Sequence, residues 1–419
     1  MKKNLLTTAF LVVTTAFIGC SSDENLAELQ GGDPVPAKGD PITVIVTDEG
    51  GDATRYTPTT TSSLTNFYMW CYNITKGEEN FPKELFSYAS GTGNSRKFNS
   101  QGGSWPATKT DVCNFYAVSV NSGEDFGENF IFTNPPYDSN HFLKFDYSMP
   151  TKATKETVGI PDTDELSLTS GTIVPSQETV IDIDNTEDLL VSKNTNVAQQ
   201  TLINNSSAFS MDFKHALCGV EISARFTSAE WQGSLGSQTT GVDEGAEITI
   251  NYIALHGLYT SATYNMSEMA WDFSGLSTSN KYDAYYRFGF GASGKKITAQ
   301  AVESAAEKIK RKVLVDDNTL LLIPQAVLPW DAAENSGIGS GDADGKGMAY
   351  IEINCTFKNV DGFNDGEGGS FFLPLKFSVN NLEAGKKYKL LINLNNLLYE
   401  SGQTAGDYDA VFGNVEIQV

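Results

Sequence analysis

The chain has 419 residues with 52 Asp or Glu and 29 Lys or Arg, which gives a formal net charge of -23 at pH 7. A surface this negative repels phosphate backbones, which argues against nucleic acid as a partner. The length suffices for two domains of ordinary size. Abundant glycine (38 residues) and short apolar runs between turn residues favour an all-β fold.

Residues 1–19 have the pattern of a signal peptide that is cut before Cys20. Lys2 and Lys3 precede an apolar stretch that is too short to span a bilayer. This stretch ends in Gly19 and Cys20, the small residue and acylated cysteine of a bacterial lipoprotein signal. We therefore predict that Cys20 carries lipid, palmitate included, with an ordinary secretory signal as the alternative.

The mature chain is predicted to consist of a tether and two domains. Residues 20–40 are rich in Asp, Glu, Gly and Pro and should form a flexible tether. A polar sequence at 277–281 places the domains at 41–278 and 279–419. Residues 299–312 contain good helix formers but could equally continue a strand. Alternating apolar and polar residues predict strands at 114–120, 208–213, 221–226, 246–255, 348–357, 371–377 and 388–394.

The cysteines beyond Cys20 are far apart and form no CxxC pair, which argues against a zinc knuckle. Each lies in an apolar, strand-like context that is typical of a buried free thiol, with one disulfide as the alternative. These residues are Cys71, Cys113, Cys218 and Cys355.

No catalytic motif is found. His141, His215 and His256 belong to no HExxH motif, Cys/His cluster or recognisable triad, and GxSxG is absent. The loop at 289–296 has the spacing of a phosphate loop, but Lys296 replaces the hydroxyl residue that would hold magnesium. We predict a hairpin turn there, no enzymatic activity and no cofactor.

Acidic, glycine-rich loops at 341–345 and 361–369 contain oxygen ligands of the kind that calcium prefers. If Asp342 is the first ligand of an EF-hand loop, Ile353 falls where a bidentate Glu is needed. We therefore predict solvated loops and no metal site.

The tryptophans leave one alternative function open. Trp105, Trp231 and Trp330 could stack on sugars, although Trp in β domains is more often part of the core. The alternative is therefore a surface glycan-binding lipoprotein of the outer membrane.

Several short motifs occur in a common order behind the signal: TR at 54–55, SLTNF at 63–67, GSWP at 103–106, NFYA at 114–117, DLL at 188–190, FKHALCGV at 213–220, LIPQ at 322–325, PL at 374–375 and AGKKY at 384–388. Together they resemble the fimbrillin family of Bacteroidales, the type V pilus subunits and their lipoprotein relatives. The resemblance implies two transthyretin-like β-sandwich domains in tandem.

It further implies a lipidated precursor on the outer membrane that becomes part of a surface-exposed fimbrium and supports adhesion. Subunits of this family polymerise by donor-strand exchange after an arginine-specific protease releases the first strand. The implied partners are that protease, other fimbrial subunits, and the outer membrane through the lipid on Cys20.

The first strand and its cleavage site are assigned by position. Arg55 closes a loose loop after the β-rich run 42–46, with Lys38 as a rival cleavage site and an ordinary exposed arginine as the alternative for Arg55. We predict that Ile42, Val44 and Val46 belong to the displaced strand. Its loss would leave unpaired backbone groups and uncovered apolar side chains.

Residues 411–419 are the candidate donor strand, because their last part, 415–419, alternates apolar and polar residues. Burying its apolar side chains at about 1.5 to 3 kcal/mol each would contribute roughly 8 to 15 kcal/mol before ordering costs. The alternative is that they form the last strand of their own domain. A stalk subunit needs both a removable strand and a donor, whereas a tip or anchor needs one. The donor candidates are Val411, Phe412, Val415, Ile417 and Val419.

Overall fold

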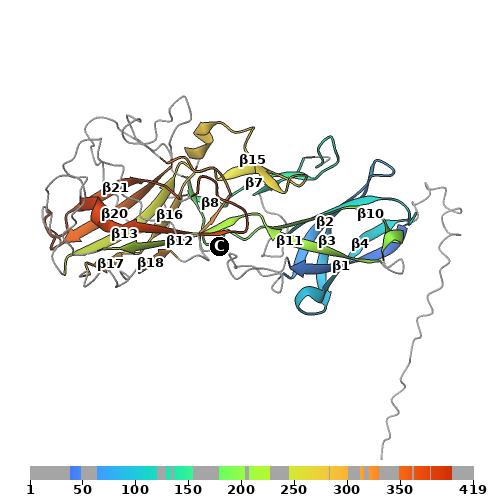
Figure 1. Cartoon of the computed structure of the whole chain (residues 1–419), viewed down its shortest axis with the longest axis horizontal. Helices are drawn as coiled ribbons and strands as arrows, with labels where there is room; N and C mark the ends of the chain where they lie inside the picture. Colours follow the sequence, from blue (N-terminus) through green and yellow to red (C-terminus); the bar gives the residue numbers. More distant parts are fainter. Residues whose placement is uncertain are drawn as a thin grey trace, which may run out of the picture.

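The computed structural model describes residues 38–48, 64–119, 129–133, 136–153, 179–202, 207–226, 245–282, 284–300, 312–315, 320–329, 349–360, 363–377 and 379–398. Their regular structure is β-strand with short 3-10 helices, which confirms the predicted all-β fold. Across these ranges, no helix has the length and apolar character to cross a membrane. The molecule is elongated, with a barrel at one end and packed sheets at the other (Figure 1).

The barrel contains the amino-terminal strands and closes in the order β1, β11, β10, β5, β2, β3, β4. β1 and β11 run parallel, and the other neighbouring pairs are antiparallel. Closure leaves no open sheet edge. The strands are β1 (Lys38–Asp48), β2 (Asn66–Asn73), β3 (Glu78–Ser90), β4 (Arg96–Pro106), β5 (Cys113–Ser119), β10 (Leu190–Val197) and β11 (Ala208–His215).

Aromatic rings fill much of the barrel interior. The ring of Phe67 lies 5.6 Å from that of Phe86, 5.2 Å from that of Phe98 and 5.0 Å from that of Phe213. The opposite walls of the barrel thus pack on each other as the sheets of a sandwich do. The buried cluster also includes Ile42, Val44, Val46, Trp105, Phe115, Phe209 and Met211.

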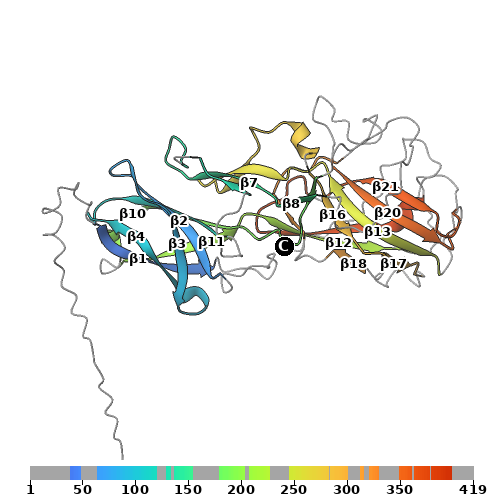
Figure 2. The ribbon, with the colours of Figure 1, turned by 180° about the vertical axis from the view of Figure 1, so that it is seen from behind.

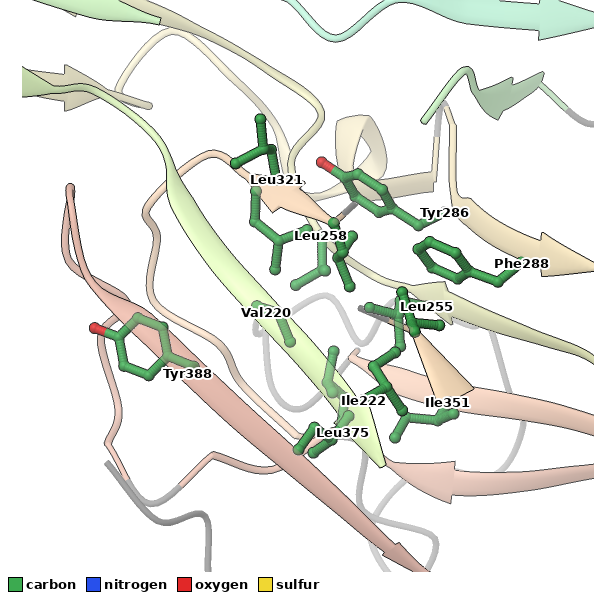
Figure 3. Close-up of a cluster of buried hydrophobic side chains, with 14 of the residues drawn as sticks. Val220, Ile222, Leu255, Leu258, Tyr286, Phe288, Leu321, Ile351, Leu375 and Tyr388 are labelled. Atoms are coloured by element: carbon green, nitrogen blue, oxygen red, sulfur yellow. The ribbon is translucent and has the colours of Figure 1, made fainter. Parts of the chain in front are cut away.

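Two facing sheets form the other end of the molecule. The first joins β12 (Cys218–Arg225) to β18 (Lys312–Val315), β19 (Leu321–Leu322) and β22 (Lys387–Asn393). The second contains β13 (Glu247–His256), β16 (Tyr286–Gly289), β17 (Lys295–Thr298), β20 (Tyr350–Lys358) and β21 (Gly368–Pro374). Figure 3 shows Val220 and Ile222 of β12 beside Leu255 of β13 and Ile351 of β20, which is the core of a β-sandwich.

A smaller sheet lies between the barrel and this sandwich in both views (Figures 1 and 2). It has the order β15 (Ala270–Asp272), β14 (Ser261–Asn265), β7 (Lys144–Ser148), β6 (Phe130–Ile131), and a separate pair joins β8 (Thr151–Ala153) to β9 (Thr179–Ile181). The Trp271 indole donates to the carbonyl of Ala216 at 2.7 Å, where the chain passes from β11 to β12. The short helices are η1 (Gly93–Ser95), η2 (Gln199–Thr201), η4 (Thr278–Tyr282) and η5 (Leu394–Leu398).

Each strand predicted from alternation corresponds to an observed one: β5, β11, β12, β13, β20, β21 and β22. The predicted domain limits, 41–278 and 279–419, do not coincide with a change of sheet, because β13 pairs with β16, β17 and β20 across this position. The strands change from barrel to sandwich at 216–217. Most of 299–312 lies outside the described residues.

Gln325 of the LIPQ sequence joins two loops of the sandwich. Its amide accepts from the Tyr259 N–H at 2.8 Å and donates to the carbonyls of Tyr259 and Ile323 at 2.9 and 3.1 Å. Gln325→Leu should lower the free energy of unfolding by about 2 kcal/mol, because these backbone groups lose their partner in a part-buried site. Urea unfolding measures this, and equal losses for Gln325→Leu and the exposed control Gln300→Leu would contradict the assignment.

Candidate functional site

The predicted displaced-strand residues lie in β1, in the barrel wall (Figure 1). The side chains of Ile42, Val44 and Val46 point inward and are at most 1% exposed. Thr43 and Ile45 alternate with them and are partly exposed. This pattern gives β1 one dry face and one wetter face. Displacement of the strand stays a prediction.

Both long edges of β1 are paired. Residues 43–48 run parallel to 208–213 of β11, and the other edge is antiparallel to β4. Removing β1 would therefore open the barrel and leave β4 and β11 as unpaired edges. It would also uncover the ring and thioether side chains of Phe98, Phe209 and Met211, which belong to the same buried cluster.

The amino end of β1 approaches β4 very closely. A Cβ atom on Gly39 would lie 2.3 Å from the carbonyl oxygen of Trp105 and 2.4 Å from that of Pro106, so only glycine fits. The pairing with β4 shifts register between Lys38 and Pro41 and again between Pro41 and Thr43. Pro41 has no N–H to donate, and a bulge is where a strand tolerates this.

Asp40 is held by two side chains from other elements. Its Oδ2 accepts from Lys109 Nζ at 2.9 Å and from Gln199 Nε2 at 2.6 Å. The hydrogen bond from Lys109 lowers the pKa of this carboxyl, and the bond from Gln199 adds to the shift. Gln199 is 1% exposed, and its Oε1 is buried with no hydrogen-bond partner among the residues that the structure describes. The ion pair itself is about half exposed and contributes little.

The remaining predicted site residues lie outside the described part of the chain. These are the lipidation site Cys20, the cleavage candidate Arg55, and the donor candidates Val411, Phe412, Val415, Ile417 and Val419. Their roles stay predictions. Lys38, the rival cleavage site, is the first residue of β1 and pairs with Pro106.

The cysteines within the described ranges are free and buried: Cys71, Cys113, Cys218 and Cys355. Burial raises the pKa of the Cys355 thiol to about 12. Thiols in such a state are inert packing groups rather than nucleophiles.

The histidines make structural contacts. His215 Nδ1 lies 2.7 Å from Asp188 Oδ2 next to the passage from β11 to β12, and the His141 ring stacks on Tyr72 at 4.4 Å. His256 Nε2 lies 3.1 Å from Glu352 Oε2. Burial raises the pKa of Glu352, but hydrogen bonds from His256 and Tyr252 outweigh this and lower it. In the part of the chain with assigned structure, no three His, Cys, Asp or Glu residues gather as a metal site would require.

The loop at 289–296 is not the predicted hairpin turn. β16 and β17 both run antiparallel to β13, at Tyr252 to Leu255 and at Glu247 to Ile250. β16 and β17 therefore run in the same direction, one after the other along β13. The loop between them passes Asn251, where β13 also shifts register against β20. The sequence on either side of the loop is strand-like, but this could not show that both short strands pair with the same neighbour.

Trp105 is part of the barrel core. It is 1% exposed, and its indole donates to the carbonyl of Ser207 at 3.1 Å. A ring buried in this way cannot stack on a sugar, whereas Trp231 and Trp330 lie outside the described residues.

The chain matches no protein-family model and no curated protein sequence. Among solved structures, a protein from Bacteroides uniformis with a suggested role in cell adhesion shares 12% identity at a TM-score of 0.37, over 91% of this chain and 98% of that one. The tip fimbrial protein Mfa3 of Porphyromonas gingivalis, truncated at its C-terminus, shares 8% identity at a TM-score of 0.32, over 84% and 94%. The fimbrial anchor protein Mfa2 of the same species shares 10% at 0.29, over 84% and 90%.

Identities of 8 to 12% and TM-scores of 0.29 to 0.37 do not establish a shared function. The function is therefore argued from β1 and its surroundings.

Sequence reasoning missed the contacts of Asp40. Lys109 and Gln199 are 69 and 159 residues away from it along the chain. Neither residue belongs to a motif, and no local signal could have paired them with β1.

Proposed function

We propose that this chain is a non-enzymatic subunit or accessory tip protein of a cell-surface fimbria that joins its neighbours by exchange of β1. Cys20 would carry the lipid that holds the precursor on the outer membrane. An arginine-specific protease would then cut at Arg55. The sequence resemblance leads to this proposal, and the placement of β1 supports it.

The supporting observation is that β1 pairs with β4 on one edge and with β11 on the other, and so closes the barrel. This strand comes first among the described elements, and Arg55 follows it by seven residues beyond Asp48. One cut at Arg55 would therefore separate β1 and the tether from the rest of the chain. The inward side chains Ile42, Val44 and Val46 contribute roughly 5 to 9 kcal/mol by burial. The opened groove would favour any strand that restores this burial and the backbone pairing with β4 and β11.

Protease treatment of the purified precursor tests this proposal. We expect an arginine-specific protease to cut after Arg55 and the product to form ladders that resist mild SDS. Arg55→Ala should abolish both cutting and ladders, while Arg225→Ala in β12 should leave both unchanged. Cutting without ladders would contradict a stalk role, and a cut product that also fails to bind a peptide of residues 411–419 would contradict strand exchange.

A further inference from the structure

A hollow of about 370 Å³ lies between the two sheets of the sandwich, where β17 of one sheet is next to β18 of the other. Both views show β17 in the part of the sandwich that is farther from the barrel (Figures 1 and 2). The hollow is lined by residues 296–300, by Lys312 at the start of β18, and by Phe226 just after β12. Its volume is within the range of small-molecule sites.

The backbone of β17 and of the two residues after it turns alternate groups toward this hollow. The Ala299 N–H donates to the carbonyl of Ala246 at 2.8 Å, on the side of β13. In an antiparallel pair, hydrogen-bonded positions alternate with positions whose backbone groups face the other way. The N–H and C=O groups of Lys296, Thr298 and Gln300 therefore face away from β13, toward the second sheet.

Two of these three positions are bonded to the second sheet. The Lys312 ammonium donates to the carbonyl of Lys296, and the Gln300 N–H donates to the carbonyl of Phe226 at 3.1 Å. Thr298 lies between them, and its backbone N–H and C=O have no hydrogen-bond partner among the residues with assigned structure. One backbone donor and one backbone acceptor are therefore open to a ligand in the hollow.

Cationic and polar side chains surround this open position. Lys296 Nζ donates to Glu247 Oε1 at 3.0 Å, while its side chain is 61% exposed. An ammonium has three N–H donors, so Lys296 and Lys312 both keep donors for a ligand. Thr298 and Gln300 add an exposed hydroxyl and an exposed amide. Two ammonium groups against one carboxylate make the site positive, in a chain whose net charge is -23.

The buried side of the hollow is apolar. Phe226, Ile297 and Ala299 are 2%, 6% and 5% exposed and belong to the core of the sandwich. A ligand here meets an apolar surface on one side and hydrogen-bond donors around it. A pyranose ring has this character, because its C–H groups form an apolar face and its hydroxyls lie at the rim.

The same contacts argue against a strand or a polyanion as the ligand. An added strand needs several free backbone groups in a row, whereas Lys312 and Phe226 occupy the positions on both sides of Thr298. A polyanion is repelled by the net charge of the whole chain. A single carboxylate brings one negative charge, which the two lysines can balance.

We propose that this hollow binds one acidic sugar unit, either a hexuronate or a sialic acid. The ammonium groups of Lys312 and Lys296 bind its carboxylate. The backbone of Thr298 and the side chains of Thr298 and Gln300 bind its hydroxyls, and the apolar face of the ring lies against Ile297. The inference adds a ligand site to the sandwich and does not depend on exchange of β1, whose ladder assay tests a separate claim.

Calorimetric titration of the full-length chain tests the ligand class. The probes are free glucuronic acid and free N-acetylneuraminic acid, with glucose and acetate as controls. We expect one acidic sugar to bind about tenfold more tightly than either control, and its affinity to fall as salt is added, because salt screens the exposed lysines. The acidic sugar that binds more tightly identifies the class. Binding of neither acidic sugar, or equal binding of glucose or of acetate, would overturn the inference.

Two variants test the place of the site. Lys312→Met should weaken binding of the acidic sugar about tenfold, because it removes a charged donor. Thr298→Val keeps the shape of the side chain, deletes its hydroxyl and should weaken binding about threefold to tenfold. Lys97→Met makes the same change at an exposed lysine of the barrel and should leave the affinity unchanged.

Urea unfolding of each variant shows that it is folded, and Thr298→Val decides the question if Lys312→Met is not. Unchanged affinity in the folded variants of Thr298 and Lys312, or an equal loss in Lys97→Met, would overturn the inference.

Discussion

Val44→Asp should destabilise the barrel by at least about 3 kcal/mol, because it places a carboxylate in a fully buried, apolar position. Val44 is 0% exposed and belongs to the same buried cluster as Phe98 and Phe209. Because β1 closes the barrel, loss of the packing at Val44 should release the whole strand from the barrel wall. Urea unfolding followed by tryptophan fluorescence measures the effect, since Trp105 lies in the same interior.

The loss should also depend on pH in a definite direction. Burial disfavours the charged carboxylate, so the pKa of the new Asp rises in the folded state above its unfolded value of about 3.9. The full cost is present above the folded pKa and shrinks as the pH falls toward the unfolded value. Thr43→Asp, one residue away on the outward face, should cost little at any pH. Equal losses for both variants would show that β1 does not present Val44 to the interior.

Phe67→Ala should lower the free energy of unfolding of the barrel by about 3 to 5 kcal/mol, the usual cost of truncating a fully buried ring. Phe67 is 1% exposed and its ring contacts those of Phe86, Phe98 and Phe213 on three other strands. Removing it leaves a cavity between opposite walls of the barrel. The rigid β-strand framework limits how far that cavity can collapse. Differential scanning calorimetry measures the loss.

The control for this truncation is Leu85→Ala in β3, which is 38% exposed and lies in the same wall of the barrel. It should cost less than about 1 kcal/mol, because surface substitutions lose little burial. A loss for Phe67→Ala no larger than that of Leu85→Ala would mean that the barrel interior is not packed around Phe67.

Strand positions could be predicted from the sequence where one face of the strand is buried and the other is more exposed. In β13, Ile248 and Ile250 alternate with Thr249 and are fully buried, and in β1 the same pattern holds at Ile42, Val44 and Val46. The short strands β6, β8, β9 and β19 have two or three residues each, too few for a period to be recognised. β6 and β19 pair with the longer strands β7 and β12, whereas β8 and β9 pair with each other.

The features of β1 likewise divide into those that the sequence predicts and those that only the structure shows. The sequence alone determined the alternation of β1 and its position ahead of Arg55, because side-chain period is a local property of the chain. Only the tertiary structure decided that β1 pairs with β11 and β4, that Gly39 meets the Trp105 carbonyl, and that Lys109 and Gln199 reach Asp40. Such contacts join residues far apart along the chain, and their register follows from packing the whole barrel.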